Sequence, residues 1–217
     1  MTAFAVRPKS RVEIRPGPPP QEDAKILQRA IRDSVFTSPE AFLKTLDYVN
    51  EMPLEDWEAE IRSSTWAVIE RGEDVVGVAV ARLPNREMDR DIDPDKARFI
   101  ESVWIAPELR GQQIGERLVR FLFEVECAKN PQVKQFFLWV FEENYRAIRL
   151  YDRMGFEYTE VKHLVDRGNR TELRFKYRLM FDIGVVRATK TAVNKRARRK
   201  DQRKFGLRYR ILGGNFS

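Results

Sequence analysis

The sequence predicts an α/β fold in which helices cover both faces of a mixed, mostly antiparallel sheet. Between Phe99 and Phe156, two strongly apolar segments alternate with two amphipathic segments, which is the pattern of a β-α-β-α unit. Both apolar segments lack a polar face, as parallel strands buried on both sides do. On either side of this unit, alternating segments joined by turn sequences predict antiparallel pairs of strands.

Size and composition suit one domain with a substantial core, since the chain has 217 residues and a hydrophobic content of 42%. No apolar run approaches the ~20 residues of a membrane span. The N-terminal residues lack the apolar segment of a signal peptide. The single cysteine, Cys127, excludes an internal disulfide framework and suits a reducing compartment. These observations predict a cytoplasmic protein without membrane association, and they indicate no oligomeric state.

The net charge of +7 is concentrated at the C-terminal end. Residues 181–217 contain 11 Lys and Arg against 2 Asp and Glu, a balance of +9 that leaves −2 for residues 1–180. We therefore expect a near-neutral domain over residues 1–180 and a basic C-terminal extension over residues 181–217. The cations of residues 187–210 suit nucleic acid as a partner. A solvated extension, either a disordered arm or a basic helix, explains the same composition.

The N-terminal third predicts one strand and three helices. Val12 and Ile14 alternate with charged residues in a first strand, which the prolines of residues 16–20 end. A helix begins at residues 21–23, with apolar residues at helical spacing up to Val35. Ser38-Pro39-Glu40 predicts a second helix start that continues to Tyr48, and residues 53–61 predict a third, short helix.

The middle of the chain begins with a hairpin of two strands, residues 65–70 and 75–83, joined by a turn that contains Gly72. Gly77 inside the second strand indicates a bulge or a close backbone approach. Residues 84–96 are rich in Asp, Arg and Pro and predict an exposed, mobile loop. Acidic residues within 86–95 favour a cationic partner.

The apolar segment of residues 98–105 predicts a strand buried on both faces, with Phe99, Glu101, Val103 and Ile105 on one of them. Glu101 is therefore a carboxylate in an apolar row. Residues 115–129 predict a helix that ends at Asn130-Pro131. The strand of residues 135–141 follows, parallel to the first through a right-handed crossover.

The last predicted elements have clear end signals. Asn144 stands at the N-cap of a helix that continues to Met154, and Gly155 stands at its C-cap. Residues 158–164 and 171–180 predict an antiparallel pair with a turn at residues 166–169. Beyond Met180 the periodicity fades.

The turn Arg110-Gly111-Gln112-Gln113-Ile114-Gly115 leads directly into the first of these two helices. The first amides of a helix have no intrahelical partner, and the helix end carries about half a positive charge. Gly115 has no Cβ to keep a ligand away, and Arg110 adds charge. Such a turn suits a phosphate group, although an ordinary tight turn has the same composition.

The segment from Pro107 to Gly115, followed by Leu118 and Val119, resembles motif A of the GNAT superfamily of N-acetyltransferases. The segment from Asn144 to Tyr151, closing with Met154-Gly155-Phe156, is similar to motif B of that family. The resemblance extends more weakly over residues 11–180. The family pattern is Arg/Gln-x-x-Gly-x-Gly/Ala, and this chain has Gln113 where the first Gly is expected.

The resemblance implies transfer of an acetyl group from acetyl-CoA to a primary amine of a small molecule or a protein, with no metal ion. It also implies that the two parallel strands splay apart and that the cofactor lies in the opening. The residues that it assigns to acetyl-CoA come from the first parallel strand, the following turn and the second helix: Val103, Trp104, Ile105, Arg110, Gly111, Gln112, Gln113, Ile114, Gly115, Glu116, Asn144 and Tyr151.

Two residues are candidates for catalysis. Glu101 is the candidate base that deprotonates the amine, because apolar neighbours raise the pKa of a carboxyl group. Tyr151 matches the tyrosine of the family motif and is the candidate acid for the departing thiolate. Each has a structural alternative: Glu101 pairs with an arginine such as Arg98, Tyr151 fills the core, and Asn144 only caps its helix.

Further readings stay open at this stage. The presence of Gln113 in place of the family's first Gly also fits two other kinds of protein with this fold. One binds an acyl-CoA without transferring the acyl group, and the other prefers a longer acyl group. A nucleic-acid or ribosome-associated protein would use the basic extension. Cys127 lies mid-helix and fits packing better than nucleophilic catalysis, and His163 is the one histidine, on a late strand.

Overall fold

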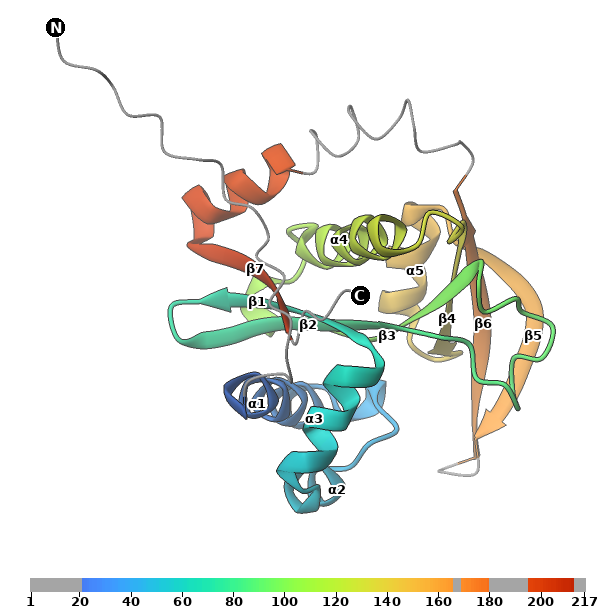
Figure 1. The fold of residues 1–217 in the computed structure, drawn as a ribbon, viewed down its shortest axis with the longest axis horizontal. Helices are drawn as coiled ribbons and strands as arrows, with labels where there is room; N and C mark the ends of the chain where they lie inside the picture. The colour runs from blue at the N-terminus through green and yellow to red at the C-terminus, as the bar shows by residue number, and fades with distance from the viewer. Residues whose placement is uncertain (1–20, 166–168, 180–194, 213–217) are drawn as a thin grey trace, which may run out of the picture.

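The computed structural model describes residues 21–165, 169–179 and 195–212. The strand predicted at Val12 and Ile14, most of the turn at residues 166–169 and much of the extension lie outside the described residues. The described strands form one seven-stranded sheet in the order β5-β6-β4-β3-β2-β1-β7 (Figure 1). They are β1 (Thr65–Arg71), β2 (Asp74–Arg82), β3 (Ala97–Ile105), β4 (Gln135–Phe141), β5 (Glu157–Val165), β6 (Arg170–Arg178) and β7 (Leu207–Leu212).

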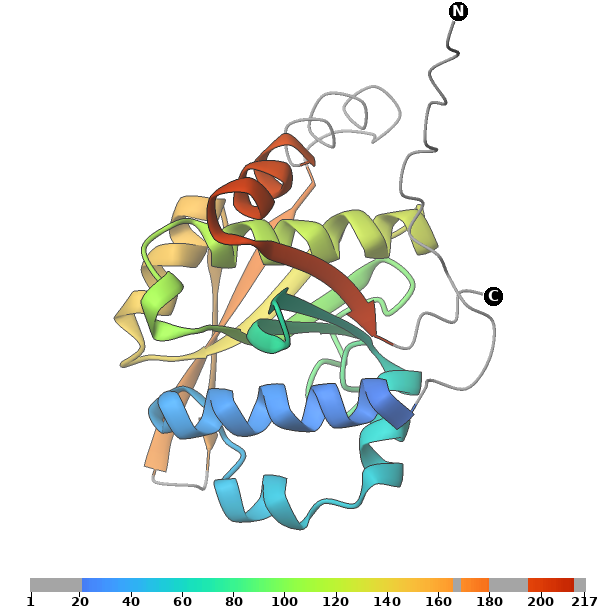
Figure 2. The ribbon, with the colours of Figure 1, turned by 90° about the vertical axis from the view of Figure 1, so that its left-hand side faces the viewer.

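All neighbouring strands are antiparallel except β3 and β4, which are parallel. The helices α1 (Gln21–Thr37), α2 (Leu46–Glu51) and α3 (Leu54–Ser63) lie on one side of the sheet, and α4 (Ile114–Lys129) and α5 (Tyr145–Met154) lie on the other (Figures 1 and 2). This arrangement confirms the predicted fold class. No helix within the described ranges is long and apolar enough to cross a membrane.

The core fills both sides of the sheet because the helices carry apolar stripes that match it. α1 buries Leu27 and Ile31, while α4 buries Leu118 and Leu122 on the opposite face. The buried faces account for the amphipathic spacing that predicted these two helices. Cys127 is buried in α4 with its thiol 3.6 Å from the Val133 carbonyl oxygen, which agrees with a packing role.

The second predicted helix begins later than expected. Residues 39–41 form only a 3₁₀ turn, because the hydroxyl of Ser38 makes no cap hydrogen bond and instead accepts one from Arg110 Nη2 (2.7 Å). α2 begins after Thr45, whose Oγ1 accepts a hydrogen bond from the Tyr48 amide (3.1 Å). The predicted continuous helix from Ser38 to Tyr48 is therefore wrong, since a distant arginine takes the hydroxyl that would have capped it.

The loop of residues 84–96 is partly buried, contrary to the expectation of an exposed loop. Ile92 is 8% exposed and packs with Phe99 in a small second core. Asp91 pairs with Arg174 of β6 at 2.6 Å. The polar composition of the loop concealed these contacts because their partners lie elsewhere in the chain.

The described part of the basic extension packs onto the domain. Residues 195–205 form a helix, and β7 pairs antiparallel with β1 over six residues, from Leu207 opposite Arg71 to Leu212 opposite Trp66. Figure 2 shows this helix above α4, with β7 descending from it along the edge of the sheet. Leu207 and Leu212 are buried. The sequence reading predicted no strand in this region.

Candidate functional site

The parallel strands β3 and β4 separate along their length. They pair only over three residues, Ala97 to Phe99 opposite Gln135 to Phe137. Beyond this point β3 continues beside β2 as far as Ile105, and β4 continues beside β6 as far as Phe141. The carboxyl ends of the two strands therefore border an opening in the sheet, as the resemblance implied.

A bulge in β3 lies at this opening. Two residues of β3, Ser102 and Val103, stand opposite one residue of β2, and Ser102 has a positive φ of 51°. The bulge reverses the alternation of the strand. Trp104 Nε1 donates a hydrogen bond to Thr37 Oγ1 of α1 (2.9 Å), while Ile105 packs toward α4. The predicted single face that joins Phe99 and Glu101 to Ile105 is therefore wrong, because strict alternation ends at the bulge.

The register of β2 and β3 decides which backbone groups of β3 face the opening. Ala106 donates a backbone hydrogen bond to Val76 (2.9 Å), and Trp104 is aligned with Val78. Because hydrogen-bonded pairs alternate along an antiparallel ladder, the Trp104 backbone turns toward β2, and those of Val103 and Ile105 turn toward the opening. Val103 thus turns its amide and its carbonyl toward the opening, and Ile105 turns its amide there, while Arg110 Nε occupies the Ile105 carbonyl oxygen.

The turn between β3 and α4 leaves a row of backbone amides without partners. Within the described residues, the backbone amides of residues 111–116 donate no hydrogen bond, and the first amide bound into α4 is that of Arg117, which donates to the Gln113 carbonyl (3.2 Å). Gln113 is the N-cap with φ 60°, and Gly111 has φ 76°. Successive free amides at a helix start form an anion site.

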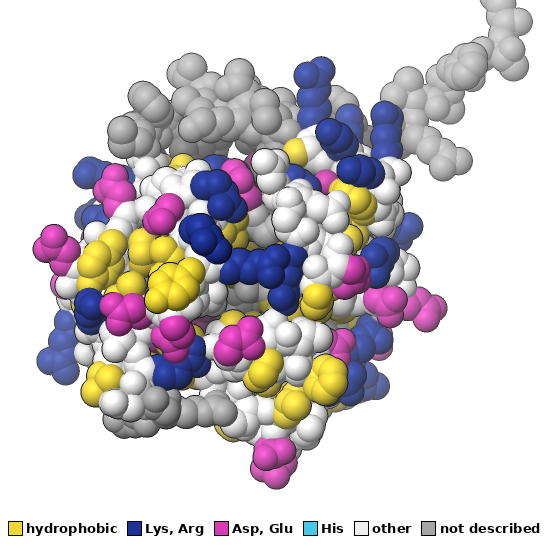
Figure 3. All heavy atoms as spheres, turned by 180° about the vertical axis from the view of Figure 1, so that it is seen from behind, with side chains coloured by type: hydrophobic (Ala, Val, Ile, Leu, Met, Phe, Trp, Pro, Cys, Tyr) yellow, Lys and Arg dark blue, Asp and Glu magenta, His cyan; other side chains and the backbone are white. Residues whose placement is uncertain are grey.

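Figure 3 shows the back of the molecule, the side on which Figure 2 places the turn before α4. Lys and Arg side chains border a hollow near the middle of this face (Figure 3). The face that contains this turn thus has a hollow with basic side chains at its border.

Arg110 shapes the turn more than it reaches away from it. Its Nε donates to the Ile105 carbonyl oxygen (2.9 Å) and its Nη2 donates to Ser38 Oγ (2.7 Å). Burial lowers the pKa of the Arg110 guanidinium, and the charge of Arg146 lowers it further. Arg146 lies in the first turn of α5, and sequence reasoning did not single it out. Its position two residues after Asn144, within the second motif, was the available signal.

Two cations that repel one another are stabilised by an anion between them. Arg110 lies in the turn that leads into α4 and Arg146 lies in the first turn of α5, and the N-termini of both helices also favour negative charge. The arrangement therefore suits a diphosphate better than a neutral ligand.

Asn144 and Tyr151 occupy the ends of one helix face on α5. Asn144 caps the helix, since its Oδ1 accepts from the Ala147 amide (3.2 Å). Tyr151 is 7% exposed, and its ring packs against Phe156 at 5.5 Å between centroids. Its hydroxyl forms no hydrogen bond with any described residue, and burial raises the pKa of Tyr151 far above its usual value. The phenol therefore stays protonated and can donate.

Glu101 pairs with Arg82 rather than with Arg98, which was the anticipated structural alternative. Arg82 Nε donates to Glu101 Oε1 at 2.7 Å, whereas Arg98 pairs with Glu126 of α4. Burial raises the pKa of Glu101, and Arg82 opposes this shift without cancelling it. The carboxyl side chain is 26% exposed, so it remains accessible at the surface of the opening.

A second carboxylate lies near Glu101. Glu172 of β6 is 9% exposed, and its pKa is raised by burial and further by the charge of Glu101. His163 Nδ1 lies 3.8 Å from Glu172 Oε2 and has no hydrogen-bond partner among the described residues. Glu172 was not singled out from the sequence, because only the strand register brings β6 beside β4.

The C-terminal extension contacts the turn through a buried ion pair. Arg117, in the first turn of α4, makes two hydrogen bonds of 2.6 Å to Asp201, and its Nη2 donates to the Gln112 carbonyl oxygen (2.9 Å). The Tyr209 hydroxyl donates to the same carboxylate (2.7 Å). Asp201 thus fixes an arginine that holds the turn in shape.

Comparison with known proteins gives a match to one protein family. The sequence profile of the acetyltransferase (GNAT) family matches residues 28–156, which is more than half of the chain and includes both motifs. No match was found among curated protein sequences.

Several solved structures share the fold. NAA60 of Arabidopsis thaliana, in complex with a bisubstrate analogue, is 18% identical with a TM-score of 0.54 and covers 76% of this chain and 95% of its own. The ribosomal-protein-alanine N-acetyltransferase of Brucella melitensis is 21% identical with a TM-score of 0.56, and the match covers 73% of this chain and 96% of that structure. An aminoglycoside acetyltransferase in complex with coenzyme A and kanamycin is 21% identical with a TM-score of 0.55, and the match covers 73% of this chain and 90% of that structure. These similarities establish a common fold.

Proposed function

The chain belongs to the GNAT family of acetyltransferases, and we propose that it transfers an acetyl group from acetyl-CoA to a primary amine. The observation that carries this proposal is the opening between β3 and β4, placed beside the free amides of residues 111–116. The opening between the strands suits an extended arm that contains amides, and the free backbone amides suit a diphosphate. Acetyl-CoA combines these two chemical groups in one molecule.

Different residues around the opening bind different parts of acetyl-CoA. The amides of residues 111–116 donate hydrogen bonds to the diphosphate, and the guanidinium groups of Arg110 and Arg146 supply its countercharge. The Val103 carbonyl and the Ile105 amide pair with the amides of the pantetheine arm, as an added strand would. The side-chain nitrogen Nδ2 of Asn144 is available to the arm, because capping uses only Oδ1.

The side chains of β3 and α5 provide the proton transfers. Acetyl-CoA supplies an acetyl group activated as a thioester. Glu101 accepts a proton from the ammonium group, directly or through a water, and the amine nitrogen then bonds to the acetyl carbon. The Val103 amide stabilises the oxyanion that forms. Burial raises the pKa of Tyr151, so the phenol is protonated when the sulfur departs. It donates this proton to the sulfur as the carbon–sulfur bond breaks, and the strongly basic phenolate recovers a proton from the acylated nitrogen.

The acceptor that fits best carries positive charge next to the reactive amine. Glu101 and Glu172 interact electrostatically, so a cation between them relieves their repulsion. The acidic residues of the 86–95 loop contribute less than the sequence indicated, since Asp91 pairs with Arg174 and Asp93 with Lys96. One structural neighbour is a ribosomal-protein-alanine N-acetyltransferase, and another is an aminoglycoside acetyltransferase in complex with kanamycin. Both are consistent with a cationic amine as the acceptor.

Calorimetric titration with acetyl-CoA and coenzyme A tests the proposal first. We expect micromolar binding, and absence of heat at millimolar cofactor would exclude the function. Thioester consumption with a panel of amines then separates transfer from binding alone. Use of a longer acyl-CoA in preference to acetyl-CoA would revise the donor.

Tyr151→Phe tests the role of the tyrosine. Because the phenol acts on the leaving sulfur, we expect kcat to fall about 10²–10⁴-fold while the Kd for acetyl-CoA changes less than about 3-fold. Tyr145→Phe, at an exposed position of the same helix, is the matched control and should leave both constants unchanged. A loss of cofactor affinity without a fall in kcat would assign Tyr151 to the core.

A further inference from the structure

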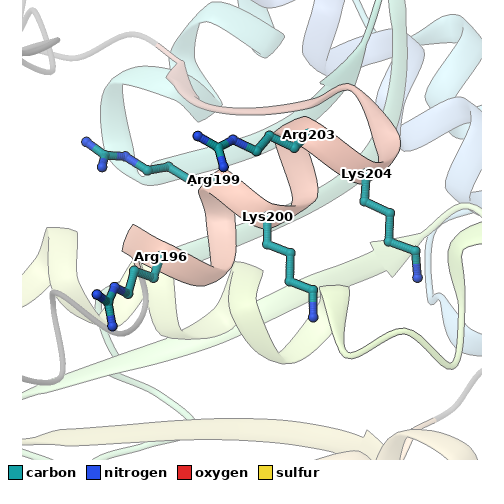
Figure 4. Close-up of a pocket in the computed structure, with 5 residues that line it drawn as sticks. All are labelled: Arg196, Arg199, Lys200, Arg203 and Lys204. Carbon is teal, nitrogen blue, oxygen red and sulfur yellow. The ribbon is translucent and has the colours of Figure 1, made fainter.

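The helix of residues 195–205 carries a continuous basic face. Its cations are spaced so that they form one stripe over two turns, and they line an open hollow of about 410 Å³: Arg196, Arg199, Lys200, Arg203 and Lys204. Figure 4 shows that all five extend from the same helix and that Lys200 and Lys204 point the same way, one turn apart. At ~1.5 Å of rise per residue, the stripe is about 12 Å long.

The opposite face of this helix is attached to the domain. Asp201 has a side chain only 3% exposed in its pair with Arg117, and Arg198 pairs with Glu124 of α4 at 3.0 Å. The Arg198 guanidinium also lies 4.5 Å from the ring centroid of Phe121. The helix therefore presents its cations in a fixed orientation.

The five cations have no countercharge in the described structure. None of them forms a salt bridge with a residue in the described ranges, whereas Arg198 and Asp201 on the other face are both paired. Like charges four residues apart destabilise a helix, and this stripe contains three such pairs: Arg196 with Lys200, Arg199 with Arg203, and Lys200 with Lys204. An external polyanion would relieve this repulsion.

We propose that the basic face of residues 195–205 binds the phosphodiester backbone of nucleic acid. A row of about 12 Å spans several phosphates of one strand, and fixed cations bind a backbone without reading its sequence. A membrane surface fits less well, because an interfacial helix needs an apolar face to insert and this helix uses its less polar face to pack on α4. This surface is independent of acetyl transfer.

Fluorescence anisotropy of the full chain with a labelled 20-nucleotide oligouridine and a labelled 20-base-pair DNA duplex, at 50 to 200 mM NaCl, tests the proposal. Five neutralised phosphates give a slope of log K against log salt of about −3.5 on the single strand, so binding should weaken about 100-fold over this range. A steeper slope on the duplex, about −4.5, is expected on the same ground.

The variants R199Q/R203Q and R199E/R203E remove two of the cations. We expect R199Q/R203Q to reduce the magnitude of the single-strand slope by about 1.4 and to weaken binding about 20-fold at 100 mM salt. R199E/R203E reverses the two charges and should weaken binding more than R199Q/R203Q does. Its matched control is R86E/R90E in the exposed part of the 84–96 loop, which should change affinity less than about 2-fold. Because R199Q/R203Q removes like-charge repulsion, its thermal midpoint should equal or exceed that of the natural sequence.

Four results would overturn the proposal. They are an unchanged slope in R199Q/R203Q, an equal loss in the R86E/R90E control, displacement of the oligonucleotide by 1 mM coenzyme A, and tighter binding to vesicles with 30% phosphatidylserine than to either nucleic acid. Displacement by coenzyme A would assign the basic face to the cofactor. Retained binding in its presence supports a separate nucleic-acid surface.

Discussion

Gln113 adopts a left-handed backbone conformation at the turn that precedes α4, with φ 60°. A side chain in this region costs about 1–2 kcal/mol, which explains why the family pattern has Gly there. The turn nevertheless forms with its amides free, so the substitution changes the stability of the loop more than its shape. Local strain of this kind is common where a backbone holds a ligand.

Gln113→Gly should therefore stabilise the protein. Relief of the left-handed strain exceeds the extra entropy of Gly in the unfolded chain, so we expect a gain of about 0.5–1 kcal/mol in the free energy of unfolding. Urea titration measures it, and calorimetry should show an unchanged or tighter Kd for acetyl-CoA. Gln132→Gly, in the turn after α4, serves as a control without positive φ and should destabilise. A loss of stability in Gln113→Gly would contradict the strain argument.

Glu101→Gln separates activity from stability. Loss of the base should lower kcat about 10²–10⁴-fold. Because burial raises the pKa of Glu101 in the fold, the folded protein binds more protons than the unfolded chain between the usual and the raised value, and stability falls as pH rises through that window.

Gln carries no proton in that window, so the variant should match the natural protein in thermal midpoint near pH 4 and equal or exceed it at pH 8. Differential scanning calorimetry at both values measures this. A variant less stable than the natural protein at pH 8 would mean that the ion pair with Arg82 outweighs the cost of burial.

Residue-level predictions succeeded where the signal was local. Asn144 and Gly155 are the caps of α5, with Gly155 at φ 91°, because each cap depends on its own few residues. The ion-pair partner of Glu101 and the position of Arg146 opposite Arg110 depend on contacts between elements, and no spacing in the sequence encodes them.

At the scale of elements, the buried pair between Arg117 and Asp201 connects the extension to the turn before α4. Its side chains are 14% and 3% exposed, so removal of one partner leaves a buried charge without compensation. Arg117 also holds the carbonyl of Gln112. Loss of the pair should therefore affect both stability and cofactor binding.

Asp201→Asn should lower the free energy of unfolding by about 3–5 kcal/mol and raise the KM for acetyl-CoA more than it lowers kcat. Steady-state kinetics and urea titration measure the two effects. The control Glu58→Gln removes an exposed pair with Arg62 on α3 and should cost less than about 0.5 kcal/mol. An unchanged KM would show that the turn keeps its shape without Arg117.

Most elements were predictable because periodicity and turn residues mark them. The strand β4 and the helices α1 and α4 are near their predicted bounds, since their apolar spacing directly reflects burial. β7 was missed because LRYRIL stands in a strongly basic region, and pairing with a strand about 140 residues away decided its structure. The bulge at Ser102 likewise depends on the neighbouring strand.

At the scale of the whole molecule, the sheet includes both the first and the last described strands. β7 covers the edge of β1 and buries Leu207 and Leu212. Arg210 of β7 also pairs with Asp23 of α1 and with Glu70 of β1. The extension is thus part of the structural support of the domain as well as a carrier of charge.

A chain that ends at residue 194 should be much less stable than the full chain. Burial of the two leucines alone contributes about 3–6 kcal/mol, and the exposed edge of β1 invites aggregation. Thermal unfolding and the soluble fraction measure these effects. Leu207→Ala should cost about 2–5 kcal/mol, whereas the adjacent exposed Arg208→Ala should be nearly neutral. Equal midpoints for the truncated and full chains would show that the domain is complete without β7.

The pairing of β7 with β1 has a consequence for the order of events during synthesis. The ribosome releases β1 through β6 before β7 exists, so the nascent domain carries an unprotected strand edge while the rest of it is already able to collapse. Until β7 emerges, this edge is open to misassembly with other nascent chains, and protection by a chaperone would matter most in that interval. Arrested chains that lack β7 should therefore be cleaved by protease at β1 and become resistant once residues 207–212 are free to dock.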